Sequence, residues 1–355
     1  MLGPPRTVRP SGTDVVLAFS FETWQTVCWR EFSFTSDRLF LHLYSSPRVR
    51  RLILADAWQF APARLARRLL GVTGDLPFPS GPATVHVEPT RLRRRDPTSA
   101  AAAHRAYRAY DARLAAAAAR AGMRDPVLIT THPLHAAAAD RRRWAGVTYL
   151  GRDDFAEYGA RAPWRAALRE AYRRISAAGI PVVGVTQAIV DAIAPTGPAL
   201  VMPNGVDPDE WATPGRPPAW FDALPRPRLL YTGALGTRLD PDVLAALSRA
   251  HPQASIVLVG HAADPEHLAG LAELPGVHIR GRHSRADIRA MTFAAEVCLL
   301  PHVRTPLTRS MSPLKLFEYL AAGRPVVSTD LEPVRAVAAQ AGGAVLLAGT
   351  PEEFA

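Results

Sequence analysis

The chain has 355 residues, of which 48% are hydrophobic and 21% charged, with a mean hydropathy of −0.01. That length predicts about two domains, and the composition excludes long disorder and collagen-like repeats. No apolar stretch approaches the roughly 20 residues that cross a bilayer, and Cys28 and Cys298 are too few for a disulfide framework or a cysteine metal cluster. Met1–Pro10 carries prolines and arginines instead of an apolar segment, so we expect no signal peptide and a cytoplasmic protein.

The positive charge is unevenly distributed along the chain. There are 42 Lys and Arg against 32 Asp and Glu, a formal net charge of +10, and Lys315 is the only lysine. Such a preference for arginine, alongside abundant alanine and proline, is typical of coding bias in a GC-rich genome. Residues 1–196 carry 28 cations and 16 anions, a net charge of +12, whereas residues 197–355 have a net charge of −2. The basicity therefore belongs to the N-terminal half.

The N-terminal half contains short apolar runs separated by longer, alanine-rich segments. We expect strands at Asp14–Phe19, Arg51–Ala55, Thr84–Glu88, Pro126–Thr130, Val147–Leu150 and Pro181–Thr186. The alanine-rich stretch between Ser99 and Gly122 has no interior Gly or Pro and predicts a long helix. Pro208–Pro227 holds six prolines and predicts a stiff connector.

The C-terminal half has the same alternation in a clearer form. Strands are expected at Leu229–Thr232, Ser255–Gly260, Val277–Ile279, Glu296–Pro301, Pro325–Thr329 and Gly343–Leu347. Helices are expected at Pro241–Ala250, Glu266–Leu271, Arg285–Phe293, Leu314–Ala322 and Pro333–Ala341, with Asp240, Ser284 and Ser312 as N-caps. Continuous apolar strands between amphipathic helices indicate parallel sheets covered on both faces. We therefore predict two doubly wound α/β domains, at 1–200 and 228–355, joined by a proline-rich linker region at 201–227.

A phosphate-binding helix start is expected in the segment Ser310–Thr329. Ser312 would cap a helix with Pro313 in its first position, leaving N–H groups free for an anion. Lys315 falls in the first turn, where the helix dipole disfavours a cation, and an anionic ligand would explain it. Glu318 follows one turn later and could accept hydrogen bonds from ligand hydroxyls. For both side chains the plainer alternative is a solvated surface position.

This segment resembles the nucleotide-sugar signature of GT-B glycosyltransferases, the group 1 and family-4-like set. More narrowly it is similar to bacterial enzymes of cell-wall polysaccharide synthesis, including those of the teichuronic-acid type. Further stretches that match in order and spacing are Met202–Asp207, Leu230–Leu235, Val257–Gly260, Gly281 before Ser284, and Val297–Pro301. In the N-terminal half, Val147–Phe155 resembles a strand-end Asp-Asp motif of this subgroup.

The resemblance implies a GT-B fold, two Rossmann-like domains facing a cleft, with the nucleotide-sugar donor on the C-terminal domain and the acceptor on the N-terminal one. It implies that Glu318 holds the ribose hydroxyls. Diphosphate and sugar would face the backbone at Ser312, Pro313 and Leu314, and the turn of Gly233, Ala234 and Leu235 would pass close to the phosphates. The nucleobase would be flanked by the loop Gly281, Arg282 and His283.

Some positions depart from the family pattern. The second glutamate that the family often has is replaced by Ser310, and the phosphate-binding Arg and Lys fall on Ala234 and Leu239. Arg238 and Lys315 are the nearest substitutes. The family usually adds one or two helices beyond Ala355, so the resemblance implies that the chain is short or incomplete.

Candidates for catalysis lie in the N-terminal half. Asp153 and Asp154 could supply a general base or a contact to a sugar hydroxyl, and a turn and helix cap is equally expected of them. His132 and His135 follow an expected strand, although a lone histidine is more often structural.

No metal requirement is predicted. The triplets Asp207–Asp209 and Asp240–Asp242 both have a central proline, which indicates turns and helix caps rather than metal ligands. A helix dipole and Lys315 would stabilise the departing diphosphate instead.

The basic N-terminal half allows two interpretations. Arg91–Arg95, Arg141–Arg143 and the amphipathic stretch Ala61–Leu70 could be solvated surface, or could meet anionic phospholipid at the inner face of the membrane or a lipid-linked acceptor. No nucleic-acid-binding motif accompanies the charge, so no nucleic-acid partner is expected.

The sequence thus predicts a metal-independent glycosyltransferase, without a cofactor other than its nucleotide diphosphate-sugar co-substrate, acting on a cell-surface polysaccharide or a lipid-linked acceptor. A nucleotide-sugar epimerase and a non-catalytic GT-B scaffold in polysaccharide assembly are the alternatives. The epimerase would lack an acceptor, and the scaffold interpretation rests on Ser310 and on the missing Arg and Lys pair.

Overall fold

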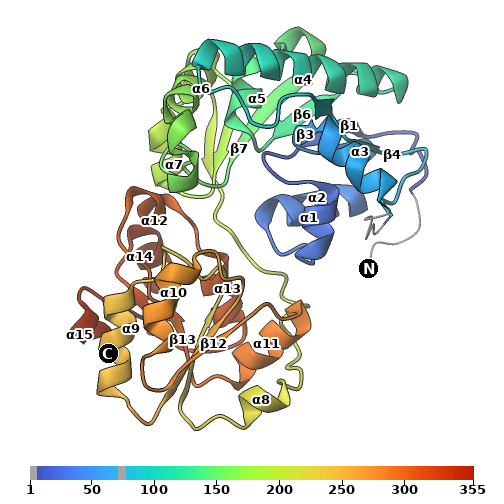
Figure 1. Cartoon of the computed structure of the whole chain (residues 1–355). Coiled ribbons are helices and arrows are strands. Elements are labelled where there is room, and N and C mark those ends of the chain that lie inside the picture. Colours follow the sequence, from blue (N-terminus) through green and yellow to red (C-terminus); the bar gives the residue numbers. More distant parts are fainter. Residues whose placement is uncertain (1–5, 71–76) are drawn as a thin grey trace. The chain divides into compact units, whose positions relative to one another are not determined.

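The computed structural model describes residues 6–70 and 77–355. The chain divides into two units, Met1–Met202 and Pro203–Ala355, each with its own parallel sheet (Figure 1). The division falls after Met202, so all but the first two residues of the predicted linker region 201–227 are grouped with the second unit.

The first unit is built on a parallel sheet of seven strands within its described residues, in the order β4-β2-β1-β6-β7-β8-β9. The strands are β1 (Thr13–Ala18), β2 (Val49–Ala55), β4 (Thr84–Val87), β6 (Val127–Thr130), β7 (Gly146–Gly151), β8 (Val182–Gly184) and β9 (Ala199–Val201). A separate parallel pair joins β3 (Gln59–Phe60) to β5 (Thr90–Arg91). The six predicted strands are confirmed within one or two residues at most ends, whereas β3, β5 and β9 are additional.

Helices cover both faces of this sheet. They are α1 (Trp24–Trp29), α2 (Thr35–Ser45), α3 (Ala61–Leu69), α4 (Ala100–Arg120), α5 (Pro133–Ala138), α6 (Arg165–Ala177) and α7 (Gln187–Ile193), with 3₁₀ turns η1 (Arg141–Arg143) and η2 (Gly159–Trp164). Alternate residues of β1 enter opposite apolar clusters, because successive side chains of a strand point to opposite faces. Val16 packs in the cluster of α4 to α7, and Leu17 in that of α1 and α2. The predicted long helix is α4, capped by Ser99.

The second unit has a parallel sheet of six strands in the order β12-β11-β10-β13-β14-β15. The strands are β10 (Arg228–Thr232), β11 (Ser255–Val259), β12 (Val277–Arg280), β13 (Val297–Leu300), β14 (Val326–Thr329) and β15 (Val345–Ala348). All six correspond to predicted strands. The strand order reverses at β10, where β11 lies on one side and β13 on the other. In doubly wound sheets ligands bind outside the carboxyl ends of the strands at such a point.

Most helices of the second unit begin at, or one residue from, the start that the sequence predicts. They are α8 (Ala219–Asp222), α9 (Pro241–Ala250), α10 (Pro265–Ala272), α11 (Arg285–Ala294), α12 (Pro306–Ser310), α13 (Leu314–Ala321), α14 (Glu332–Ala338) and α15 (Pro351–Phe354). Asp240 caps α9 by accepting from the N–H groups of Asp242 and Val243, and Ser284 caps α11 by accepting from Asp287 N–H. These two predicted caps are confirmed.

Candidate functional site

Two glycines shape the carboxyl edge of the second sheet. Gly233 follows β10 with φ +141°, and Gly260 follows β11 with φ +155°, which L side chains rarely adopt. A Cβ at Gly260 would collide with the Gly233 carbonyl oxygen, and one at Gly233 would collide with Cε and Nζ of Lys315. The Gly233 N–H donates to the Val259 carbonyl at 2.8 Å. The turn after β10 is therefore held against β11 with the Lys315 ammonium directly beside its backbone.

Lys315 and Arg238 bring two cations to this turn. The pKa of Lys315 is lowered to about 8, mainly because the side chain is buried and also because Arg238 is nearby. The carboxylate of Glu318 acts in the opposite direction and raises this pKa. Within the described residues neither cation has a carboxylate ion-pair partner: Lys315 Nζ lies 5.6 Å from the Tyr231 ring centroid, and Arg238 Nη1 lies 3.8 Å from Met311 Sδ. Two half-buried like charges with no paired acid are unfavourable unless an anion joins them. This arrangement suits a phosphate or diphosphate group.

A buried histidine that the sequence analysis did not single out lies beneath these cations. His302 Nε2 is 3.3 Å from the Tyr231 hydroxyl, and its Nδ1 is buried without a hydrogen-bond partner in the described chain. Burial, Lys315 and Arg238 hold the pKa of His302 well below its ordinary value. The imidazole is therefore neutral and adds no positive charge to the turn.

The start of α13 differs from its prediction. The helix begins at Leu314 with Pro313 as N-cap and no side-chain cap, so the predicted capping by Ser312 is wrong. Ser312 Oγ instead accepts from Asn204 N–H at 3.2 Å, and the Ser312 carbonyl accepts from Asn204 Nδ2 at 2.6 Å. Ser312 thus ties the start of α13 to the Asn204 segment. The first N–H groups of the helix still lack intrahelical acceptors, as at any helix start.

Glu318 takes part in an ion-pair network. Arg285 Nη1 donates to Glu318 Oε1 at 3.0 Å, and the same guanidinium pairs with Glu210. Arg289 Nη1 donates to the Glu210 carbonyl at 2.9 Å. Arg285 therefore fixes the orientation of the carboxylate predicted to hold ribose hydroxyls. Arg285 and Glu210 were not predicted, because they are far from Glu318 in the sequence.

The remaining predicted donor residues lie in loops around the same sheet. Ala234 is in the turn after β10, where its carbonyl accepts from the Tyr231 hydroxyl at 3.3 Å. Gly281, Arg282 and His283 follow β12, and the His283 ring lies 5.4 Å from that of Trp220 in α8. Trp220, whose ring also lies 5.0 Å from the Arg280 guanidinium, gives this loop an aromatic neighbour that the sequence analysis missed.

The three predicted catalytic residues lie at the carboxyl edge of the first sheet. Asp153 and Asp154 follow β7, and Asp154 Oδ1 accepts from Ala156 N–H and the Tyr172 hydroxyl, with burial as the main cause of a raised pKa. His132 is 1% exposed and caps α5 through Nδ1, with Nε2 2.7 Å from the Tyr107 hydroxyl. Burial, His135 and Arg161 hold its pKa well below the ordinary value. This geometry favours a structural role for His132, and catalysis by any of the three stays a prediction.

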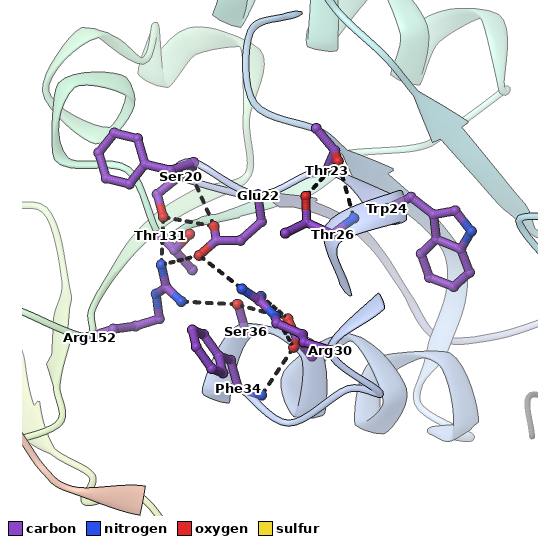
Figure 2. A network of polar contacts seen from close by, with 12 residues as sticks. Ser20, Glu22, Thr23, Trp24, Thr26, Arg30, Phe34, Ser36, Thr131 and Arg152 are labelled. Atoms are coloured by element: carbon purple, nitrogen blue, oxygen red, sulfur yellow. Dashed lines mark hydrogen bonds and ion pairs between the residues drawn. The ribbon is translucent and has the colours of Figure 1, made fainter. Parts of the chain in front are cut away.

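A buried ionic network at the same edge was not predicted at all (Figure 2). Arg152 Nη2 donates to Glu22 Oε1 at 2.6 Å and to Ser20 Oγ at 2.7 Å, and Arg30 Nη1 lies 3.9 Å from Glu22 Oε1. Burial raises the pKa of Glu22, but Arg152, Arg30 and the Phe21 N–H outweigh it and lower the pKa to about 2. The network ties the segment after β1 to the segment after β7.

The described residues contain neither a candidate metal-binding cluster nor a helix that could span a membrane. No group of three or more His, Cys, Asp or Glu side chains in residues 6–70 and 77–355 is arranged to hold a metal ion, and metal independence stays a prediction. Within the same ranges, no helix is both long enough and apolar enough to cross a bilayer. The prediction that the chain has no signal peptide was made from Met1–Pro10, and residues 1–5 of that segment lie outside the described residues.

Part of the second unit is similar to known proteins. Residues 226–355 match the family described as glycosyl transferases group 1. A stretch of 103 residues is 28% identical to the "Putative teichuronic acid biosynthesis glycosyltransferase TuaH" of Bacillus subtilis (strain 168), covering 28% of this chain and 26% of that protein. The match thus spans about a quarter of that relative's length.

Solved structures extend the likeness over nearly the whole chain. The structure of Anabaena Alr3699/HepE in complex with UDP-glucose has a TM-score of 0.56 at 16% identity, covering 96% of this chain and 87% of that one. An E. coli structure described as trehalose-6-phosphate bound with UDP-2-fluoro glucose has a TM-score of 0.65 at 11% identity, covering 96% and 89%. The predicted resemblance and the GT-B fold of two Rossmann-like domains are confirmed. The match to glycosyl transferases group 1 lies within the second unit.

Proposed function

We propose that this protein is a glycosyltransferase that takes a sugar from a nucleotide diphosphate-sugar and transfers it to a glycan or lipid-linked acceptor without a metal ion. The donor lies at the carboxyl edge of the second unit's sheet. The observation that carries the proposal is the pair Lys315 and Arg238 at the turn of Gly233, two cations without a paired carboxylate in the described chain. The family match of this unit and the UDP-sugars held by proteins of similar fold support it.

Each element of the site has a part in this proposal. The diphosphate lies between the Gly233 turn and the start of α13, where Lys315, Arg238 and free helix N–H groups face it. Positive charge fixed there stabilises the leaving diphosphate as the glycosidic bond breaks, which is the task a metal performs elsewhere. Glu318, oriented by Arg285, accepts from the ribose hydroxyls. The loop of Gly281, Arg282 and His283 flanks the base.

The first unit supplies the acceptor side. Asp153 and Asp154, after β7, are the candidates for contacting or deprotonating the acceptor hydroxyl. The net charge of +12 over residues 1–196 favours an acidic or phosphorylated acceptor and contact with an anionic membrane surface. Placement at the inner face of the membrane and a role in cell-surface polysaccharide synthesis belong to the proposal.

The test is thermal unfolding with UDP-, GDP-, ADP- and dTDP-sugars, each in EDTA and in Mg²⁺. A donor at about 100 times its Kd stabilises the native state by about 2.7 kcal/mol. We expect one nucleotide to stabilise the protein equally in both buffers, with the effect lost in Lys315→Ala and weakened in Glu318→Gln. A folded wild-type protein that responds to none of them would favour the non-catalytic scaffold, and a response only in Mg²⁺ would refute metal independence.

A further inference from the structure

A cavity of about 480 Å³ opens at the carboxyl edge of the first unit's sheet. Its walls come from the segments that follow β1 and β2, from the loop after β5, and from η2 and its neighbours. Four aromatic rings line it, those of Phe21, Trp58, Tyr107 and Trp164. Clefts at this edge of a doubly wound sheet are where such domains bind ligands.

The cavity is strongly basic. Arg94, Arg95 and Arg161 line it, and none of them has a carboxylate partner among the described residues. The Arg161 guanidinium lies 3.6 Å from the centroid of the Phe21 ring. Asp96, the acid in its lining, is already paired with Arg91 and accepts from the Tyr107 hydroxyl at 3.3 Å. The cavity therefore presents positive charge that no side chain of the described chain neutralises.

A second cavity of about 420 Å³ shares the walls of Trp58 and Arg91 with the first. Apart from Arg93 and Arg105, its other lining is apolar and includes Leu92, Pro97 and Ala106. Leu92 is 82% exposed, so its apolar side chain is accessible to a ligand. At the two shared residues, Trp58 Nε1 and Arg91 Nε are buried donors without an acceptor in the described chain. Unsatisfied buried donors beside a cavity point to a ligand that brings acceptor atoms.

We propose that the paired cavities bind a phosphate or diphosphate ester carried on an apolar chain. Arginine binds phosphate oxygens through charge-assisted hydrogen bonds, so the anionic group occupies the basic cavity. The apolar chain covers Leu92 and its neighbours in the second cavity, which removes apolar surface from water. This inference rests on the proposed function in one respect: the ester is the acceptor, or the anchor of the acceptor, of the transferase.

The test uses the full chain and a simple probe of this chemistry, dodecyl phosphate, below its critical micelle concentration. Binding is measured by calorimetry and by the fluorescence of the cavity tryptophans. We expect dodecyl phosphate to bind more tightly than inorganic phosphate and than dodecyl maltoside, which has the same chain without the charge. The double variant Arg94→Gln/Arg95→Gln should weaken dodecyl phosphate binding by about tenfold or more. Leu92→Ser should weaken dodecyl phosphate but leave inorganic phosphate unchanged.

The matched control is Arg120→Gln/Arg124→Gln, which removes the same charge from exposed side chains of the same unit. It should bind dodecyl phosphate as the wild type does, and the two double variants should bind phosphatidylglycerol vesicles alike. Equal losses of dodecyl phosphate binding in both double variants, or equal binding of dodecyl maltoside and dodecyl phosphate, would overturn the proposal.

Nucleotide stabilisation separates this inference from the proposed function. Arg94→Gln/Arg95→Gln should keep the thermal stabilisation by the donor nucleotide, which also shows that the variant is folded. Lys315→Ala should lose that stabilisation and keep dodecyl phosphate binding. A wild-type protein that binds dodecyl phosphate but no nucleotide would refute the transferase and leave the phosphate-ester site standing.

Discussion

Replacing Lys315 with methionine should stabilise the protein in the absence of ligand. Methionine keeps the length of the side chain but removes the charge that burial and Arg238 make unfavourable. A lysine pKa that falls from 10.5 to about 8 on folding corresponds to roughly 3 kcal/mol of destabilisation at neutral pH. Because the side chain is only half-buried and its contact with the Tyr231 ring is lost as well, we expect a gain of about 1–2 kcal/mol.

The sign follows from proton binding. Between pH 8 and 10.5 the unfolded chain keeps the Lys315 proton and the folded chain releases it, so the wild-type protein gains stability as pH rises through this range. The advantage of Lys315→Met should therefore be full below pH 8 and vanish by about pH 10.5. This dependence distinguishes charge burial from simple repacking.

The assay is thermal unfolding at pH 7 and pH 10 with and without donor nucleotide. Each kcal/mol raises Tm by about 2–4 °C for a unit of this size. Arg249→Met, which removes an exposed cation from α9, is the control and should leave Tm unchanged. A Tm of Lys315→Met below that of the wild type at pH 7 would refute the reasoning. A nucleotide-induced rise in Tm as large in Lys315→Met as in the wild type would also refute it.

Three further predictions concern both units. Because a bound diphosphate favours the charged amine, nucleotide affinity should be constant below pH 8 and fall by about tenfold per pH unit above it, as titration calorimetry would show; a flat profile would remove Lys315 from the site. Gly233→Ala should cost about 1–3 kcal/mol in chemical denaturation and abolish nucleotide binding, because a Cβ there meets Lys315 at a positive φ, whereas Gly270→Ala in open space in α10 should be tolerated. Glu22→Gln should destabilise the first unit by about 3 kcal/mol at pH 7, because Arg152 loses its buried partner. Since the pKa of Glu22 is lowered to about 2, that cost is present above pH 4.5 and disappears as pH falls toward 2; an equal cost at pH 2.5 would show that the charge is not its origin.

The second unit was predictable because its signals are local. Runs such as 256–259 are apolar throughout and are followed by glycine or proline, and Asp240 and Ser284 stand directly before the helices that they cap. The α/β alternation predicted a doubly wound sheet, whereas the order of its strands was not predicted. Short or two-residue strands such as β3 and β9 carry no comparable pattern, since Leu200 in β9 is exposed.

The site was predictable only where its partners are near one another in sequence or belong to the family motif. Ser312 has the ordinary position of a helix cap, but its hydroxyl accepts from Asn204, 108 residues away. Arg285 meets Glu318 across 33 residues, and Arg152 meets Glu22 across 130. Spacing along the chain carries no information about such pairs. In the first unit, where charged residues are abundant, nothing local marks Arg94 or Arg161 as lining a cavity.

The measurement that tests the central claim most directly is calorimetric titration of UDP into the protein in EDTA at pH 7, for the wild type, Lys315→Ala and Arg249→Ala. The proposed donor site predicts one nucleoside diphosphate per chain in the wild type and in Arg249→Ala, and a Kd at least about tenfold weaker in Lys315→Ala, as expected for a lost charge-assisted contact. The same titration with GDP, ADP and dTDP covers a donor with another base. A folded wild-type protein that binds none of the four, or a Lys315→Ala variant that binds as the wild type does, would contradict the donor site.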